Sequence, residues 1–189
     1  MLAFLDRTLK LWHVALAAVT AIAWFAFIII AGQLALPAVS LFRCPIGFCA
    51  TGYSANSVTL VLRTLGAEGR AFLLETMLPL DRGTPILVLF AFVVGYIWLT
   101  RPHAIWSVPL EPSHRYMLLV VPTFYCLADY GENWAFEQML RTFPQISYRS
   151  VLRASILTSV KSQLLAASLG IALALVVAVW VTAKRIQKD

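Results

Sequence analysis

The sequence predicts an all-α, polytopic membrane protein that forms a single domain over residues 1–189. Apolar residues make up 60% of the chain and charged residues 13%, about half the charged share of soluble domains. Four segments are long and apolar enough to cross a bilayer, which takes about 20 residues of helix. Backbone groups in lipid must bond within their own segment, so helices are expected. This composition excludes a soluble globule, a disordered chain and a fibrous repeat.

The first predicted span, residues 11–34, follows Arg7 and Lys10 and contains no Asp, Glu, Lys or Arg. It is longer than the apolar core of a secretory signal, which has about 7–15 residues. We therefore interpret it as a retained signal-anchor helix. Cleavage near Leu36-Pro37-Ala38 is the alternative. The other spans of the four-helix bundle are predicted at residues 83–100, 116–140 and 154–181.

The basic residues predict the orientation. The chain carries a net charge of +6, and its cations flank the apolar runs. Short basic pieces at Arg101, Arg115 and Lys184 share one side with the N-terminus, which by the positive-inside rule is cytoplasmic. The tryptophans at the same ends fit an aromatic belt: Trp12, Trp98 and Trp180. We expect a multi-pass protein of the cell (inner) membrane with both termini cytoplasmic. The chain has no stripe of basic residues that would predict nucleic acid binding.

An outer loop over residues 37–82 is too long for a simple turn. Ser54 is a suitable N-cap, and apolar residues follow it at helical spacing from Val58 to Leu65. Gly66 supplies a stop, and a second short helix is expected at residues 71–77. We expect two short amphipathic helices that lie on, or cap, the outer end of the bundle.

Cysteine and histidine usage predicts no cofactor and no metal. Cys44 and Cys49 lie in the outer loop, where a disulfide and two free thiols both fit their spacing. No second pair of ligands follows them, as a zinc site would need. Cys126 lies inside an apolar run and is expected to be a packed thiol.

The third predicted span carries unusual polar residues. Asp129, Glu132 and Asn133 are spaced i, i+3 and i+4, which places them on one helix face. An Asp at mid-helix costs about 2.5–3.5 kcal/mol on insertion scales, so such groups need partners. If spans three and four form a hairpin around Ile146, Lys161 reaches the same depth, since it lies 15 residues after that point and Glu132 lies 14 before it.

Other groups of the outer loop can reach the same place. Asp81 lies at the start of the second span, and Arg70 and Tyr53 precede it. The candidate ligand-binding residues are therefore Asp129, Glu132, Asn133, Lys161, Asp81, Arg70 and Tyr53. A ligand site is the default interpretation of ionisable groups inside a membrane. A buried ion-pair network that fixes helix register is the alternative.

Two functions of different kinds remain open. The first is a membrane protein with a polar ligand-binding cluster in the outer half of the bundle, acting as a small enzyme or a carrier for a lipid or a small polar molecule. The alternative is a non-catalytic accessory subunit or assembly factor of a membrane complex. The expected partners are membrane lipids, together with a membrane-protein partner or a second copy. The sequence contains no G-x-S-x-G, H-E-x-x-H or P-loop motif, so whether it is an enzyme stays open.

Several short motifs resemble an uncharacterised family of small four-helix bacterial integral membrane proteins. They are Thr51-Gly52-Tyr53, Leu65-Gly66 with Gly69-Arg70, Leu80-Asp81 with Pro85, Asp129-Tyr130 with Glu132-Asn133, Phe143-Pro144, and Thr158 with Lys161. The resemblance covers about two thirds of the chain, and the Asp-Tyr-x-Glu-Asn piece is its most specific part. It implies four helices and a shared role for these polar residues, but no activity. Here Gly131 stands where the family pattern has a larger apolar residue, and Cys44 and Cys49 are outside the pattern.

Overall fold

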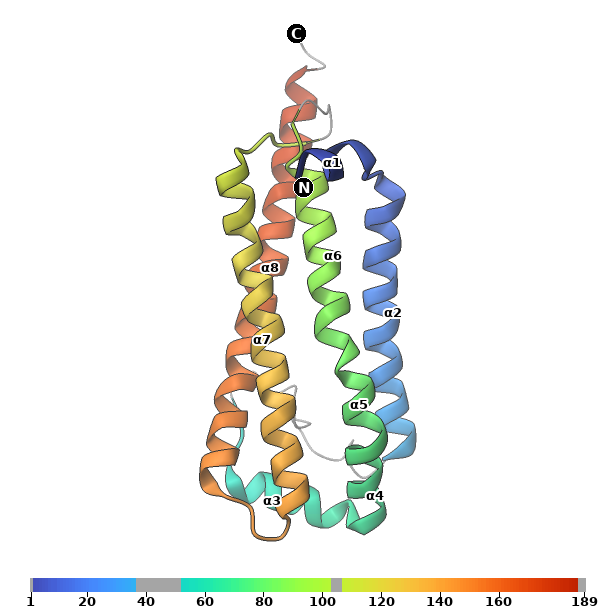
Figure 1. Ribbon diagram of the computed structural model, residues 1–189, viewed down its shortest axis with the longest axis vertical. Coiled ribbons are helices and arrows are strands. Elements are labelled where there is room, and N and C mark those ends of the chain that lie inside the picture. The colour runs from blue at the N-terminus through green and yellow to red at the C-terminus, as the bar shows by residue number, and fades with distance from the viewer. Residues whose placement is uncertain (1, 37–51, 103–106, 187–189) are drawn as a thin grey trace.

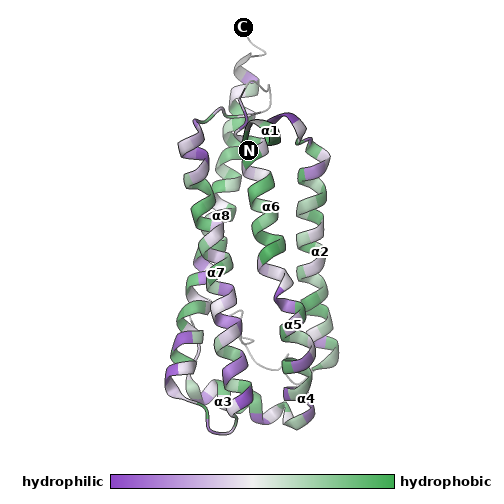
Figure 2. Cartoon of the chain, in the orientation of Figure 1, coloured by the Kyte–Doolittle hydropathy of each residue, from purple (hydrophilic) through white to green (hydrophobic). Residues whose placement is uncertain are grey.

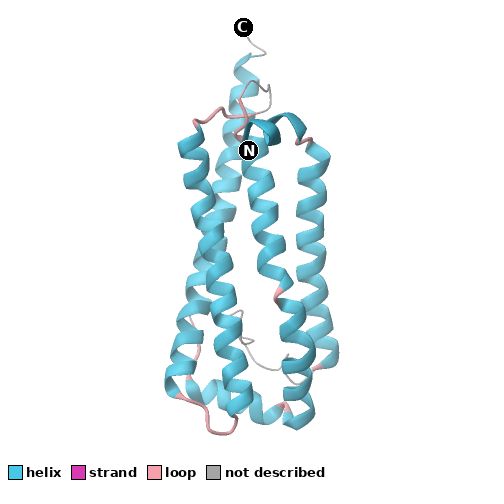
Figure 3. Ribbon diagram, viewed as in Figure 1, coloured by secondary structure: helices cyan, strands magenta, loops and turns pink. Residues whose placement is uncertain are grey.

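The computed structural model describes residues 2–36, 52–102 and 107–186. Over these ranges the chain is helical and contains no strand (Figure 3). Cys44 and Cys49 lie outside the described residues, so the structure does not bear on their pairing. Three helical segments are long and apolar enough to cross a membrane, which fits a multi-pass membrane protein: Leu11–Ala35, Gly66–Leu99 and Tyr148–Lys184.

Helices occupy all four segments that the sequence marks as apolar. They are α2 (Leu11–Ala35), α6 (Gly83–Leu99), α7 (Pro112–Thr142) and α8 (Tyr148–Ile186). The two C-terminal helices extend beyond their predicted bounds, since polar turns lengthen them past the apolar stretch. Figure 2 shows hydrophobic residues along most of α2, α6 and α8, whereas the second half of α7 carries more polar residues. Because of these polar residues, α7 is not one of the three segments that are apolar enough to cross a membrane by composition.

The long helices run side by side, with α7 packed along α8, and α6 between α7 and α2 (Figure 1). The short helix α1 (Leu2–Thr8) crosses one end of the bundle, and the C-terminus lies at the same end. The helices α3 (Ala55–Thr64) and α4 (Gly66–Phe72) close the opposite end. The N- and C-termini therefore share one end of the molecule.

The segment before α6 differs from the prediction of a separate helix at residues 71–77. Helix α4 continues through a π-helical turn, Leu73–Met77, and through α5 (Leu78–Asp81) into α6. The amide of Leu78 bonds to the carbonyl of Leu73, one residue further back than in an α-helix. Pro79 follows directly, and its ring would clash with a carbonyl of the preceding turn in regular α geometry. The wider turn relieves that clash, so the helix continues.

Helix α3 is fastened to the bundle by its apolar face. The Ser54 hydroxyl accepts a hydrogen bond from the Ser57 amide, which caps its first turn as predicted. Val58 and Leu62 are fully buried against Met139 of α7 and Ala154 of α8. Burying a leucine side chain contributes about 1.5–3 kcal/mol, so this contact fixes the outer loop to the end of the α7–α8 pair.

A buried ion pair holds the other end together. Arg115, which the sequence places in one of the short basic pieces between the spans, lies at the start of α7 and is 4% exposed. Its guanidinium donates to Asp6 of α1 through two nitrogens, at 2.5 and 2.9 Å. It also donates to the Thr100 hydroxyl and to the carbonyl of Ile97, both at the end of α6. One arginine thus joins α1, α6 and α7.

Candidate functional site

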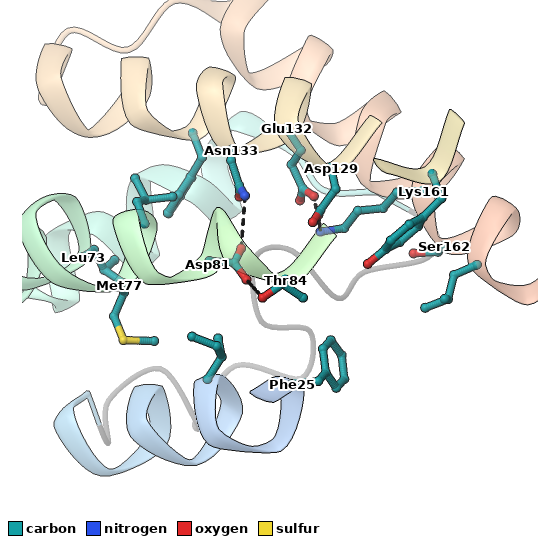
Figure 4. Close-up of a pocket in the computed structure, with 15 residues that line it drawn as sticks. Phe25, Leu73, Met77, Asp81, Thr84, Asp129, Glu132, Asn133, Lys161 and Ser162 are labelled. Carbon is teal, nitrogen blue, oxygen red and sulfur yellow. Dashed lines mark hydrogen bonds and ion pairs between the residues drawn. The ribbon is translucent and has the colours of Figure 1, made fainter. Parts of the chain in front are cut away.

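A cavity of about 200 Å³ lies between α2, α5–α6, α7 and α8 (Figure 4). Its polar lining consists of Asp81, Thr84, Tyr125, Asp129, Glu132, Asn133, Lys161 and Ser162. Apolar side chains complete the wall, among them Phe25 from α2 and Met77 from the π-helical turn. The cavity therefore brings five of the seven predicted site residues together around one space.

Lys161 joins the two acidic residues of α7. Its Nζ donates to Asp129 Oδ1 at 2.6 Å and forms an ion pair with Glu132 Oε2. The prediction that Lys161 faces these carboxylates is confirmed. Asp129 and Glu132 are each 2% exposed, so their charges are almost fully removed from solvent. One ammonium group thus serves two carboxylates that are one helical turn apart on the same face of α7.

Thr158 supports this arrangement from α8. Its hydroxyl is 2.5 Å from Glu132 Oε1, to which it donates, and it is fully buried. Thr158 lies three residues before Lys161, so both side chains point from one face of α8 toward α7. The family resemblance marks Thr158, but residue spacing does not single out a threonine inside an apolar helix.

Asp81 adds a third carboxylate from the end of α5. It accepts hydrogen bonds from the side-chain amide of Asn133 at 3.1 Å and from the Thr84 hydroxyl at 2.8 Å. Figure 4 shows Asp81 joined to Asn133 and to Thr84, beside the group formed by Lys161, Asp129 and Glu132. Thr84 was not predicted, although its position three residues after Asp81 on a helical segment could have indicated it.

Tyr53 reaches the same region from the start of the outer-loop helix. Its amide donates to the Ser155 hydroxyl of α8 at 2.8 Å. Gly52 has a φ of +77°, and a Cβ on it would overlap the Ser155 hydroxyl, so glycine is required there. Burial raises the pKa of the Tyr53 phenol to about 12, and the nearby charge of Glu132 acts in the same direction. Tyr53 thus lies beside the Glu132–Thr158–Lys161 contacts without lining the cavity.

Arg70 does not join the cluster, contrary to the prediction. Its Nη1 donates to the carbonyl of Leu62 at 2.7 Å, and its guanidinium stacks over the Phe143 ring, 4.3 Å from the ring centroid. The reason is local, because Leu62 lies in the last turn of α3, where backbone carbonyls lack helical partners. Arg70 satisfies that carbonyl and secures the outer end of the bundle.

Exposed ion pairs lie toward the outer end of α7. Glu137 is paired with Arg82 and Arg141, each at 2.8 Å. The Tyr130 hydroxyl donates to the carbonyl of Arg82 at 2.8 Å. Both arginine side chains are more than half exposed, so these pairs contribute little to stability.

The charges that line the cavity are unequal in number. Three carboxyl groups and one ammonium face the cavity. A buried excess of negative charge requires bound protons or a cation. Within the described residues no group of three or more His, Cys, Asp or Glu side chains is arranged to hold a metal ion.

Comparisons of the chain with protein-family models, with curated proteins and with solved structures gave no match. The strongest indication of function in the described residues is the cavity with its charged lining. Lys161, Asp129 and Glu132 form its centre.

Proposed function

We propose that the protein crosses the membrane four times, with α7 as the third span. Both termini share one end of the molecule in Figure 1, and a chain that ends on its starting side crosses an even number of times. Helix α7 has 31 residues, about 46 Å at 1.5 Å per residue, which exceeds a bilayer core of about 30 Å. Its polar face is turned inward, because Asp129, Glu132 and Asn133 are all buried. The membrane is the cell (inner) membrane, with both termini cytoplasmic.

We further propose that this membrane protein binds a small polar molecule in the cavity, as a carrier or a small enzyme. One observation carries the proposal: the desolvated Asp129–Lys161–Glu132 group borders a cavity instead of being closed in by side chains. An ion-pair network that only fixes helix register needs no such space. With three carboxyl groups against one ammonium, the cavity favours a ligand that donates hydrogen bonds or carries positive charge. Release of protons from these groups when a cationic ligand enters, and their uptake when it leaves, would keep the charge of the cavity balanced.

Glu132→Gln tests this proposal. Glutamine has the same shape and can still accept from Thr158, while Lys161 keeps its contact with Asp129. We expect the variant to fold, with a melting temperature within a few degrees of wild type. Native mass spectrometry of gently extracted protein should show a bound small molecule in wild type that is absent from Glu132→Gln and from Asp129→Asn/Glu132→Gln.

Glu137→Gln is the matched control, since it removes a carboxylate from the same helix outside the cavity lining. It should retain the bound molecule. Unfolding of Glu132→Gln in mild detergent would identify the residue as structural. Equal retention of the molecule in both variants would show that it binds elsewhere.

The alternative of an accessory subunit that docks a partner through the outer loop has less support. The apolar face of α3 is covered by the protein's own α7 and α8, and Leu62 is completely buried. Leu60, which is 57% exposed on the same helix, is the proper probe. If Leu60→Asp released a co-purifying protein from a folded bundle, the accessory function would be favoured.

A further inference from the structure

A second hollow lies at the opposite end of the bundle from α3 and α4. It is a groove of about 660 Å³ between the α1–α2 junction, the end of α6 and the last turns of α8. Leu99, Val176 and Val179 give it an aliphatic wall, and the Trp98 and Trp180 rings border it. This composition suits a hydrocarbon chain.

The polar groups of the groove are donors and cations. Lys10 and Arg101 line it, and among the residues that the structure describes no carboxylate lines it. Asp6, the acid of α1, is paired with Arg115 and does not neutralise these cations. The groove is therefore complementary in charge to an anion.

Two buried donors of the residues that line the groove lack acceptors in the described part of the chain. The side-chain Nε1 of Trp98 and the Nε of Arg101 are buried without a hydrogen-bond partner in the described part of the chain. A buried donor without an acceptor is costly, so such atoms are rare unless something absent from the chain satisfies them. Arg101 is held in position, since its Nη1 donates to the Leu9 carbonyl at 3.2 Å and its guanidinium lies 4.7 Å from the Trp98 ring centroid.

The start of α2 adds to the positive potential. The helix begins at Leu11, beside Lys10, so the positive end of its dipole lies at the groove, although the His13 amide of its first turn donates to the Lys10 carbonyl. An anion placed there would meet a helix N-terminus, a lysine and an arginine together.

We propose that this groove binds one anionic phospholipid. The phosphate lies against Lys10, Arg101 and the start of α2, and an acyl chain lies along Val176 and Val179. A phospholipid supplies in one molecule the anion and the hydrocarbon that the cationic end and the aliphatic wall of the groove require. Basic pockets between membrane helices at the cytoplasmic side are where such headgroups bind. This proposal is independent of the ligand proposed for the cavity.

Native mass spectrometry with defined lipids tests it. Purified, delipidated protein is titrated with phosphatidylglycerol and, separately, with phosphatidylcholine of the same acyl chains. Wild type should bind one phosphatidylglycerol in preference to phosphatidylcholine. Lys10→Gln/Arg101→Gln should weaken that binding about 30-fold, since each Lys or Arg near an anionic lipid surface contributes roughly fivefold in affinity and the two contributions multiply.

Arg149→Gln/Arg153→Gln is the matched control, because it removes two exposed arginines near the start of α8. It should leave phosphatidylglycerol binding unchanged. If the charge variant fails to fold, Val176→Trp provides a second test of lipid binding in the groove. Val176 is 50% exposed, and a larger side chain there fills the groove while keeping both cations. It should also remove the bound lipid.

Equal binding of the two lipids, or equal losses in the two charge variants, would overturn the proposal. If the wild type bound inorganic phosphate alone, and Val176→Trp did not change that binding, the groove would be an anion site that does not hold a lipid. A dimer that persists after delipidation and is lost in Val176→Trp would mean that a second copy of the chain occupies the groove.

Discussion

Replacing Lys161 with methionine tests how strongly the buried charges depend on one another. The side chain is 15% exposed, and those of Asp129 and Glu132 are each 3% exposed. Without the ammonium, the pair must bind one more proton to remain buried. Protonating an aspartate at pH 7 from an ordinary pKa near 3.9 costs about 4 kcal/mol. This agrees with the roughly 3–5 kcal/mol lost when one partner of a buried pair is removed.

Thermal unfolding in mild detergent measures the effect. For a chain of this size, about 4 kcal/mol corresponds to a decrease of about 8–16 °C in melting temperature. The deficit should shrink by about 1.4 kcal/mol for each pH unit between 7 and 5, because the folded variant holds a proton that the unfolded chain releases. Asp129→Asn/Glu132→Gln/Lys161→Met should recover most of the loss, since no unpaired charge remains.

Arg82→Met is the matched control, because it breaks an ion pair with Glu137 in which the arginine is 55% exposed. It should cost less than about 1 kcal/mol. If Lys161→Met melted within about 2 °C of wild type and showed no dependence on pH, water would be screening the cluster. Burial of Asp129 and Glu132 would then not make their charges depend on Lys161.

Three further predictions concern the supports of the site and of the opposite end. Gly52→Ala should lower stability by at least about 1 kcal/mol in thermal unfolding, because of its positive φ and the overlap with Ser155, whereas Gly95→Ala, which has open space, should not lower it. Arg115→Met should cost about 3–5 kcal/mol and expose the α1–α2 junction to limited proteolysis, and unchanged protection would contradict the role of the Asp6 pair. Tyr53 has a pKa of about 12 against 10 in the unfolded chain, so wild type should lose stability relative to Tyr53→Phe between about pH 10 and 12; a constant difference in unfolding temperature would contradict its burial.

The polar cluster shows how much of the site can be predicted from residue spacing. The i, i+3, i+4 pattern on α7 and the equal depth of Lys161 on α8 depend only on helix geometry and hairpin symmetry, and the contacts of Lys161 with Asp129 and Glu132 agree with them. Arg70 was misplaced because a long flexible cation satisfies whichever acceptor is nearest, here the Leu62 carbonyl at the end of α3. The continuous helix through Pro79 was missed because a π-helical turn accommodates the proline only in the folded backbone.

Composition and hydrophobic run length by themselves determined that the chain is helical and built for a membrane, because those properties depend on the transfer of whole segments from water to lipid. The placement of polar groups on α7 and α8 determined which face of each helix must be turned inward. Only the tertiary structure decided that a cavity remains beside these charges and that Arg115 is buried. It likewise decided that an uncovered groove lies at the α1–α2 junction. A cavity or an unpartnered buried donor remains where packed helices leave space between their side chains. Which side chains meet there depends on residues that are distant in sequence.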